Sequence, residues 1–234
     1  MKLNPSTLFA LLLLSSPSMA STINWSSEVN SILVTSTNVE LGTSFSFEIG
    51  TFSPGFIPTF HNTNQWEANW MVFDRAFDPT PKNELDGDPE GWNTIDNFFV
   101  GASEHLVTGT SDSLHTTPGA VFNQGTVAYL WVYNSKSIVP SSEWALVTDS
   151  ALTGDTGNNW IFPDPNDPPG TSYEWKLGDA DLAIVGAVNG SRGEGTFTVD
   201  PGAYQIQTHV VPEPGSVILV MLSLVGWAVR RKRI

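Results

Sequence analysis

The sequence predicts an all-β protein: a single β-sandwich or jelly-roll-like ectodomain, flanked by an N-terminal signal helix and a C-terminal transmembrane helix. Three observations predict this class. Apolar and polar residues alternate with a period of two, Gly, Pro and Asp gather between the alternating stretches, and no window between the two ends keeps a helical period. The expected segments are a signal peptide over residues 1–20, an acidic β-rich ectodomain over 21–210 and a tail over 211–234.

The N-terminal end has the composition of a secretory signal peptide. Lys2 supplies a positive charge, residues 8–14 form an uncharged apolar run, and small residues follow it. Ser18 and Ala20 stand at the −3 and −1 positions of a cleavage site. We therefore expect export of the chain, with cleavage after Ala20.

Two stretches carry the strongest strand signal. Residues 44–49 read SFSFEI, in which apolar and polar side chains alternate as they do in a half-buried strand. Residues 126–133 read TVAYLWVY, which is apolar on both faces and predicts a central or sandwiched strand. Further strands are expected at residues 31–41, 66–73, 94–100, 144–148, 181–188, 195–199 and 204–210, with a short stalk over 207–211.

The C-terminal tail has three parts. It begins with Val211, Pro212, Glu213 and Pro214, continues as an apolar run over residues 215–229 and ends in Arg230, Arg231, Lys232 and Arg233. As a helix the run spans about 22 Å, short of the roughly 30 Å hydrocarbon core, and the flanking Trp227 and arginines extend the fit. A basic end stays in the cytoplasm, so the chain before Pro212 is expected outside.

Residues 211–234 resemble the PEP-CTERM sorting tail of Gram-negative bacteria, in which a Pro-Glu-Pro motif, an apolar helix and an arginine-rich end stand together. The resemblance implies that an exosortase, a membrane transpeptidase or protease, recognises Pro212, Glu213 and Pro214 and processes the chain at or near them. The basic residues 230–233 would act as the stop-transfer end. Also implied are the secretion machinery as a partner, an intermediate anchored in the inner membrane, and a final place at the envelope surface or outside the cell.

The resemblance also links the protein to exopolysaccharide or biofilm production, with which such sorted proteins are commonly associated. Residues 47–52, 69–70, 129–134 and 143–148 look like a recurring ectodomain type among PEP-CTERM proteins, an uncharacterised group, and this likeness implies no activity. The alternative for the tail is an ordinary membrane anchor with a chance Pro-Glu-Pro.

The composition excludes several classes of protein. A net charge of −14, from 24 Asp and Glu against 10 Lys and Arg, argues against nucleic acid as a partner, because phosphates need clustered cations. The sequence has no Cys, which excludes a disulfide scaffold, a Cys-ligated metal and a cysteine nucleophile. Apolar residues make up 40% of the chain, too many for a disordered protein.

No residue is assigned a catalytic role. Residues 101–105 read GASEH, which superficially resembles a serine nucleophile elbow, but a His stands where the closing Gly is needed and no helical pattern follows. His61, His105, His115 and His209 are not paired at metal-ligand spacing. A carboxylate pair for glycoside hydrolysis stays open, since only the separation of the groups in space decides it.

Asp86, Asp88 and Glu90 form the best candidate metal site. They occupy positions 1, 3 and 5 of a calcium loop, with a Gly at position 6 for the sharp turn. Position 12 is Asn97 in place of a bidentate Glu, so a plain solvated turn is the alternative. A second acidic loop at residues 164–167 offers similar oxygen ligands, and Ca²⁺ is the one candidate cofactor.

Exposed tryptophans are the candidate glycan-binding residues. The flat face of an indole stacks on the C–H groups of a sugar ring, with Asp and Asn side chains beside it. Trp66 and Trp70, or Trp92 beside the acidic loop, are candidates for such a platform. Trp131 and Trp144 lie in apolar strands and are expected in the core.

Three functions are consistent with these features. The favoured one is a non-enzymatic surface or extracellular-matrix protein, sorted by an exosortase through its tail. The second is a lectin-like module that binds matrix polysaccharide through exposed Trp side chains, with or without Ca²⁺. The third is a secreted glycoside hydrolase with an unrecognised pair of carboxylates.

Overall fold

The structure, a computed structural model, describes residues 20–76, 91–150, 159–197 and 205–211. The expected signal helix before residue 20 and the expected transmembrane run over 215–229 lie outside these residues. Among the described helices, none is long and apolar enough to cross a membrane. The described part of the chain is mainly β-strand, as the sequence predicts.

The elements follow one another along the chain with few helices between the strands. The strands are β1 (Ala20–Ser26), β2 (Leu33–Val34), β3 (Ser46–Phe52), β4 (Trp70–Arg75), β5 (Gly91–Asn93), β6 (Phe98–Leu106), β7 (Tyr129–Tyr133), β8 (Glu143–Thr148), β9 (Ser172–Lys176), β10 (Leu182–Val185), β11 (Ala187–Val188), β12 (Ser191–Arg192), β13 (Ile206–Gln207) and β14 (His209–Val210). The helices are η2 (Phe60–Gln65), α1 (Trp66–Asn69) and η4 (Leu177–Asp179).

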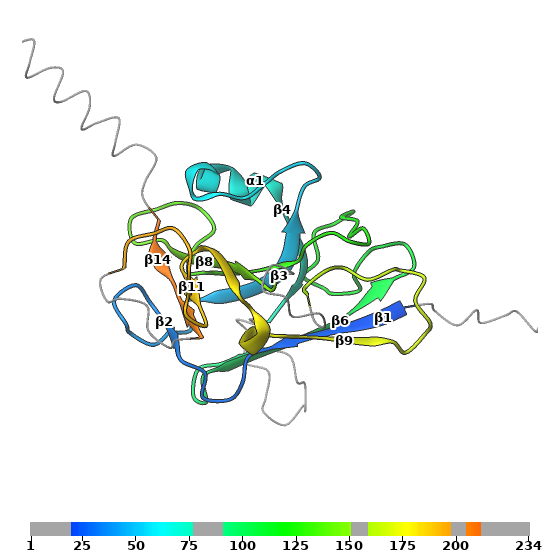
Figure 1. The fold of residues 1–234 in the computed structure, drawn as a ribbon, viewed down its shortest axis with the longest axis horizontal. Helices are drawn as coiled ribbons and strands as arrows, with labels where there is room; N and C mark the ends of the chain where they lie inside the picture. Colours follow the sequence, from blue (N-terminus) through cyan, green and yellow to red (C-terminus); the bar gives the residue numbers. More distant parts are fainter. Residues whose placement is uncertain (1–19, 77–90, 151–158, 198–204, 212–234) are drawn as a thin grey trace, which may run out of the picture.

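These strands form three sheets (Figure 1). The first has the order β5-β6-β1-β9, the second β10-β8-β7-β3-β4 with β14 also paired to β8, and the third β12-β11-β13-β2. Two of the pairs are parallel, β1 with β9 and β13 with β2, and the other described pairs are antiparallel. The parallel pairs separate this fold from a jelly roll, in which the strands are antiparallel.

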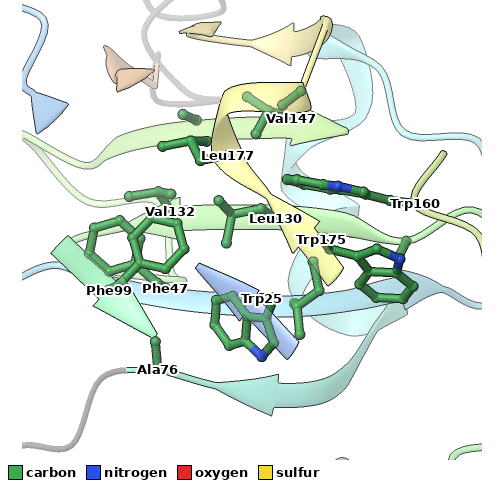
Figure 2. Packing of buried hydrophobic residues seen from close by; sticks show 14 of the residues in the cluster. Trp25, Phe47, Ala76, Phe99, Leu130, Val132, Val147, Trp160, Trp175 and Leu177 are labelled. Carbon is green, nitrogen blue, oxygen red and sulfur yellow. The ribbon is translucent and has the colours of Figure 1, made fainter. Parts of the chain in front are cut away.

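The first two sheets pack face to face around the main hydrophobic core (Figure 2). Phe47 of β3 is fully buried and stacks on Phe99 of β6, with 4.6 Å between the ring centroids. Trp25 of β1 lies opposite Gly101 of β6, where a Cβ atom would stand 2.3 Å from the indole, so the two strands need glycine at this position. This pair of sheets is the sandwich that the sequence predicts.

The six-stranded sheet is buried on its second face as well. Along β7, Leu130 and Val132 face the main core, whereas Trp131 and Tyr133 face a second cluster with Trp144 of β8. The helix α1 covers this second face, above β4 in Figure 1. Burial on both faces confirms the expectation of a sandwiched strand for Tyr129–Tyr133, although the strand does not extend back to residue 126, and it confirms the placing of Trp131 and Trp144 in the core.

Some segments differ from the expected strands. Residues 66–69 form the helix α1, and the strand of this region begins only at Trp70. The expected strand at 31–41 is reduced to β2, because Asn38 adopts a left-handed conformation with φ at 64° and turns the chain. The strand β9 is not among the expected ones, although its residues SYEWK alternate polar and aromatic side chains and its burial alternates with them.

The strand β1 is also absent from the expected set, although its burial alternates along much of its length. The strand begins at the last residue of the predicted signal peptide. The sequence at the start of β1 therefore indicates the end of a leader sequence and not a strand. The strand starts at Ala20, which pairs with Leu106 of β6. Cleavage after Ala20, which stays a prediction, would leave the strand from Ser21 onward.

A buried carboxylate lies on the second face of the six-stranded sheet. Glu48 of β3 is fully buried and accepts hydrogen bonds from Trp70 Nε1 at 2.9 Å, Arg75 Nε at 2.8 Å and Tyr133 Oη at 2.7 Å, and Lys136 Nζ lies 2.7 Å away. Burial alone would raise the pKa of Glu48, but the charges of Lys136 and Arg75 and the hydrogen bonds outweigh it and lower the pKa. The ionised carboxylate therefore ties β3 to β4, to β7 and to the residues after β7.

We expect Glu48→Gln to lower the free energy of unfolding by about 3 kcal/mol, because it leaves Arg75 and Lys136 beside a neutral amide. Urea unfolding of the purified chain at pH 7 measures the loss. Glu40→Gln is the matched control, since Glu40 is exposed and such changes stay within about 0.5 kcal/mol. Equal midpoints for the two variants would contradict the structural role of Glu48.

Candidate functional site

The junction between the β-domain and the C-terminal tail is the first candidate site. The strand β14 pairs antiparallel with β8, His209 opposite Trp144 and Val210 opposite Glu143. The Val211 N–H then donates to the Ser142 carbonyl at 2.8 Å, and the Val211 side chain is buried in the second cluster. The fold therefore includes Val211, the first residue of the predicted sorting motif, and the expected stalk over 207–211 is wrong.

The rest of the predicted tail lies beyond this junction. Pro212, Glu213, Pro214 and the basic residues 230–233 fall outside the described residues. Pro212 has no backbone N–H and cannot extend the ladder of β14, which gives a physical reason for the strand to end where it does. The folded domain that the structure describes therefore ends at Val211, and the Pro-Glu-Pro residues follow it directly in the sequence.

A set of buried and half-buried polar contacts holds the junction. The Glu143 carboxylate accepts hydrogen bonds from Ser36 N at 2.9 Å, from Ser36 Oγ at 2.9 Å and from Thr208 Oγ1. His209 is fully buried, its Nδ1 accepts from Thr196 N at 3.4 Å, and its ring packs on Phe60. These contacts join β14 to the loop after β2 and to the chain after β12.

Glycine permits the close approach of the chain to His209. Gly195 has φ at 145°, and a Cβ on it would stand 2.5 Å from His209 Cγ. Burial lowers the pKa of His209 to about 4, because the charged imidazolium would lose its water, and Glu143 offsets this only in part. Burial also lowers the pKa of His105, whose Nε2 lies 2.9 Å from the Phe122 carbonyl oxygen.

The candidate calcium loops give no assembled cation site in the described residues. Asp86, Asp88 and Glu90 lie outside them. In the loop at 164–167, Asp164 accepts hydrogen bonds from the backbone and side-chain N–H groups of Asn166, which lower the pKa of Asp164. This arrangement is an Asx turn. Within the ranges that the structure covers, no three His, Cys, Asp or Glu residues gather as metal ligands.

The tryptophans predicted to form a glycan platform are mostly core residues. Trp66 is 0% exposed and Trp70 is 6% exposed, so neither indole offers a face to a sugar, and that expectation is wrong for both. Trp66 stacks on Trp144 of β8, and Trp70 packs edge-on to Trp131 of β7. Trp92 is half-buried and packs against Phe47. The sequence pattern around α1 could not show that Trp66 and Trp70 would be buried in the second hydrophobic cluster, because the residues that cover them come from other strands.

The GASEH segment is no nucleophile elbow. Residues 101–105 lie inside the regular strand β6, so the strand-to-helix turn that exposes such a serine is not formed there. Ser103 and His105 are both buried.

Two neighbouring hollows that the sequence does not reveal lie beside the loop at residues 121–124. The first has a volume of about 310 Å³ and is lined by the end of β3, the start of β4 and β7, and the turn at residues 53–56. The second has a volume of about 410 Å³ and is lined by residues 107–109, 121–124 and 164–166. Both share Val121 and Asn123 as wall residues, so they are neighbours. The one sequence signal for the first is its Pro-Gly turn.

We expect the protein to lose stability as the pH falls from about 6.5 towards 4, because unfolding lets the buried His209 take up a proton. The stability is fully present above the ordinary histidine pKa of about 6.5 and is lost by at most about 1.4 kcal/mol per pH unit. His209→Gln should flatten the change in urea midpoint between pH 7.5 and pH 5, with His105 supplying the remainder. The exposed His115 provides the control, His115→Gln. A wild-type midpoint that is the same at both pH values would contradict the expectation.

Comparison with known proteins identifies the tail. Residues 210–233 match the family model of the PEP-CTERM protein-sorting motif. No curated protein and no solved structure matches the chain. The matched segment begins at Val210 in β14, so it overlaps the last two residues of the folded domain. Residues 210–233 are therefore a PEP-CTERM protein-sorting motif, which starts within the last β-strand that the structure describes.

Proposed function

We propose that this protein is a non-enzymatic component of the cell surface or extracellular matrix, associated with exopolysaccharide or biofilm. The observation that carries the proposal is the sorting motif at residues 210–233, joined directly to a folded β-domain. The motif implies export and processing by an exosortase, which is a membrane protein. The β-domain is then the part that acts at the surface, and its acidic charge keeps it soluble there.

The engagement of three buried or half-buried carboxylates supports the non-enzymatic part of the proposal. Glu48 is neutralised by two cations, and Glu143 accepts hydrogen bonds from Ser36 and Thr208. Asp74 accepts from Trp25 Nε1 at 2.9 Å and Ser113 Oγ at 2.6 Å. These groups join strands and loops. Among the described residues that line the two hollows, Asp164 is the one carboxylate, whereas glycoside hydrolysis uses a pair.

A lectin-like module is the second candidate function. Its support comes from the first hollow, called the aromatic hollow from here on because Phe52, Phe56 and Tyr129 line it. Trp66 and Trp70 give no support, because both are buried. Ca²⁺ remains its candidate cofactor through Asp86, Asp88 and Glu90. Glycoside hydrolysis ranks third, and release of reducing ends from host exopolysaccharide by the purified protein would favour it over the other two.

We expect the exported protein to lack the basic residues 230–233 and to keep Val211. The first follows from exosortase processing, and the second from the burial of Val211 and its bond to Ser142. Intact-mass spectrometry of the protein recovered from the cell surface or medium, beside the protein from an exosortase-deficient strain, measures both ends.

Replacing Pro212, Glu213 and Pro214 together by Ala should leave the full-length mass in the membrane fraction. The same triple exchange to Ala at the exposed residues Thr37, Val39 and Glu40, far from the motif in sequence, controls for a general defect in export. A surface species that still carries residues 230–233 would refute the processing step. A product that ends before Val211 would refute the assignment of that residue to the folded domain.

Addition of Ca²⁺ at millimolar concentration should raise the melting temperature, and a chelator should reverse the rise, if the loop at 86–90 binds the ion. The change Asp86→Asn with Asp88→Asn should abolish the effect. Asp164→Asn is the matched exchange in the second acidic loop. A melting temperature that does not move with Ca²⁺ removes calcium from the proposal.

A further inference from the structure

The aromatic hollow has a rigid wall. The turn Ser53-Pro54-Gly55-Phe56 closes with a hydrogen bond from Phe56 N to Ser53 O at 2.9 Å, and Gly55 has φ at 84°. Pro at the second position and Gly with positive φ at the third are the residues that a type II turn requires. The turn therefore holds the Phe56 ring in one place at the end of β3.

Two half-buried rings line this hollow, and a third ring supports them. Phe52 is 4% exposed and lies behind the hollow. Phe56 stacks on Phe52 with 5.2 Å between centroids, and Tyr129 packs edge-on to Phe52 at 5.8 Å. Because Phe52 fixes both neighbours, Phe56 and Tyr129 present preformed aromatic surface to the hollow.

The polar groups of the hollow fall into two sets. Thr51 Oγ1 donates to the Val127 carbonyl at 2.8 Å and Ser53 Oγ to the Asn69 carbonyl at 3.2 Å, so these side chains brace the walls. The side chains of Asn123 and Tyr129 form no hydrogen bond with another residue that the structure describes. Their donors and acceptors are available to a ligand.

The charge of the site selects an uncharged ligand. None of the described residues that line the aromatic hollow is charged, and Asp164 is the one charged group in the lining of its neighbour. With a net charge of −14 on the chain, an anionic polymer would be repelled. The second hollow adds the amides of Gln124 and Asn166, which are suited to hydroxyl groups.

We propose that the two hollows form one groove that binds an uncharged polysaccharide chain. Pyranose rings lie against Phe56 and Tyr129, where their C–H faces meet the aromatic surface, and Asn123 hydrogen-bonds the hydroxyl groups between the two hollows. This inference rests on the proposed surface function and names the matrix component that the domain holds. Sorting through the tail does not depend on the groove, so the mass experiment and a binding experiment fail independently.

Isothermal titration calorimetry of the full chain in nanodiscs tests the groove. The probes are neutral hexasaccharides of glucose, N-acetylglucosamine, mannose and galactose, and hexamannuronate as an anionic probe of equal length. We expect a neutral probe to bind and hexamannuronate not to bind. Phe56→Ala and Asn123→Ala should each weaken the binding about tenfold. Phe60→Ala removes a half-buried ring that lines neither hollow and should leave binding unchanged.

Three results would overturn the proposal. One is the absence of binding to every neutral probe, and another is binding that survives both Phe56→Ala and Asn123→Ala. The third is self-association that Phe56→Ala abolishes, which would assign the groove to a second copy of the chain. Melting temperatures of the variants, compared with Phe60→Ala, separate a lost groove from a lost fold.

Discussion

Glu48 carries a negative charge at a place in the six-stranded sheet that water does not reach, and this sets the arrangement around it. A buried carboxylate is stable only where cations and hydrogen-bond donors surround it. Trp70 and Arg75 of β4, Tyr133 of β7 and Lys136 after β7 supply those groups. They reach Glu48 only when β4 and β7 flank β3 in the observed register, so the charge specifies the pairing of the central strands.

The same sheet carries both features of functional interest. Along one edge of β8, β10 pairs with residues 146–148 and β14 with residues 143 and 144, so the strand in which the sorting motif begins completes this edge. The aromatic hollow lies at the ends of β3, β4 and β7. A sheet packed on both faces is a stiff support, and it holds the groove wall and the start of the tail in fixed positions.

Local patterns predict the central strands well and the outer ones poorly. Alternation in SFSFEI corresponds to β3, and the doubly apolar run TVAYLWVY contains β7. The strands β1 and β9 escape detection because one begins at the end of the predicted leader and the other is a five-residue edge strand in which only Trp175 is buried. The candidate sites show the same division: the tail can be read from its composition, whereas the loop at 86–90 stays a sequence hypothesis outside the described residues.

The sequence by itself determined the all-β class, the identity of the sorting tail and the absence of cysteine chemistry, because composition and short periodic patterns are local properties. Tertiary structure alone decided that Trp66 and Trp70 are core residues, that Val211 belongs to the domain and that Phe56, Asn123 and Tyr129 meet at one groove. These facts depend on contacts between residues far apart in the chain. Burial and concavity arise from packing, and no local pattern records which partner covers a side chain.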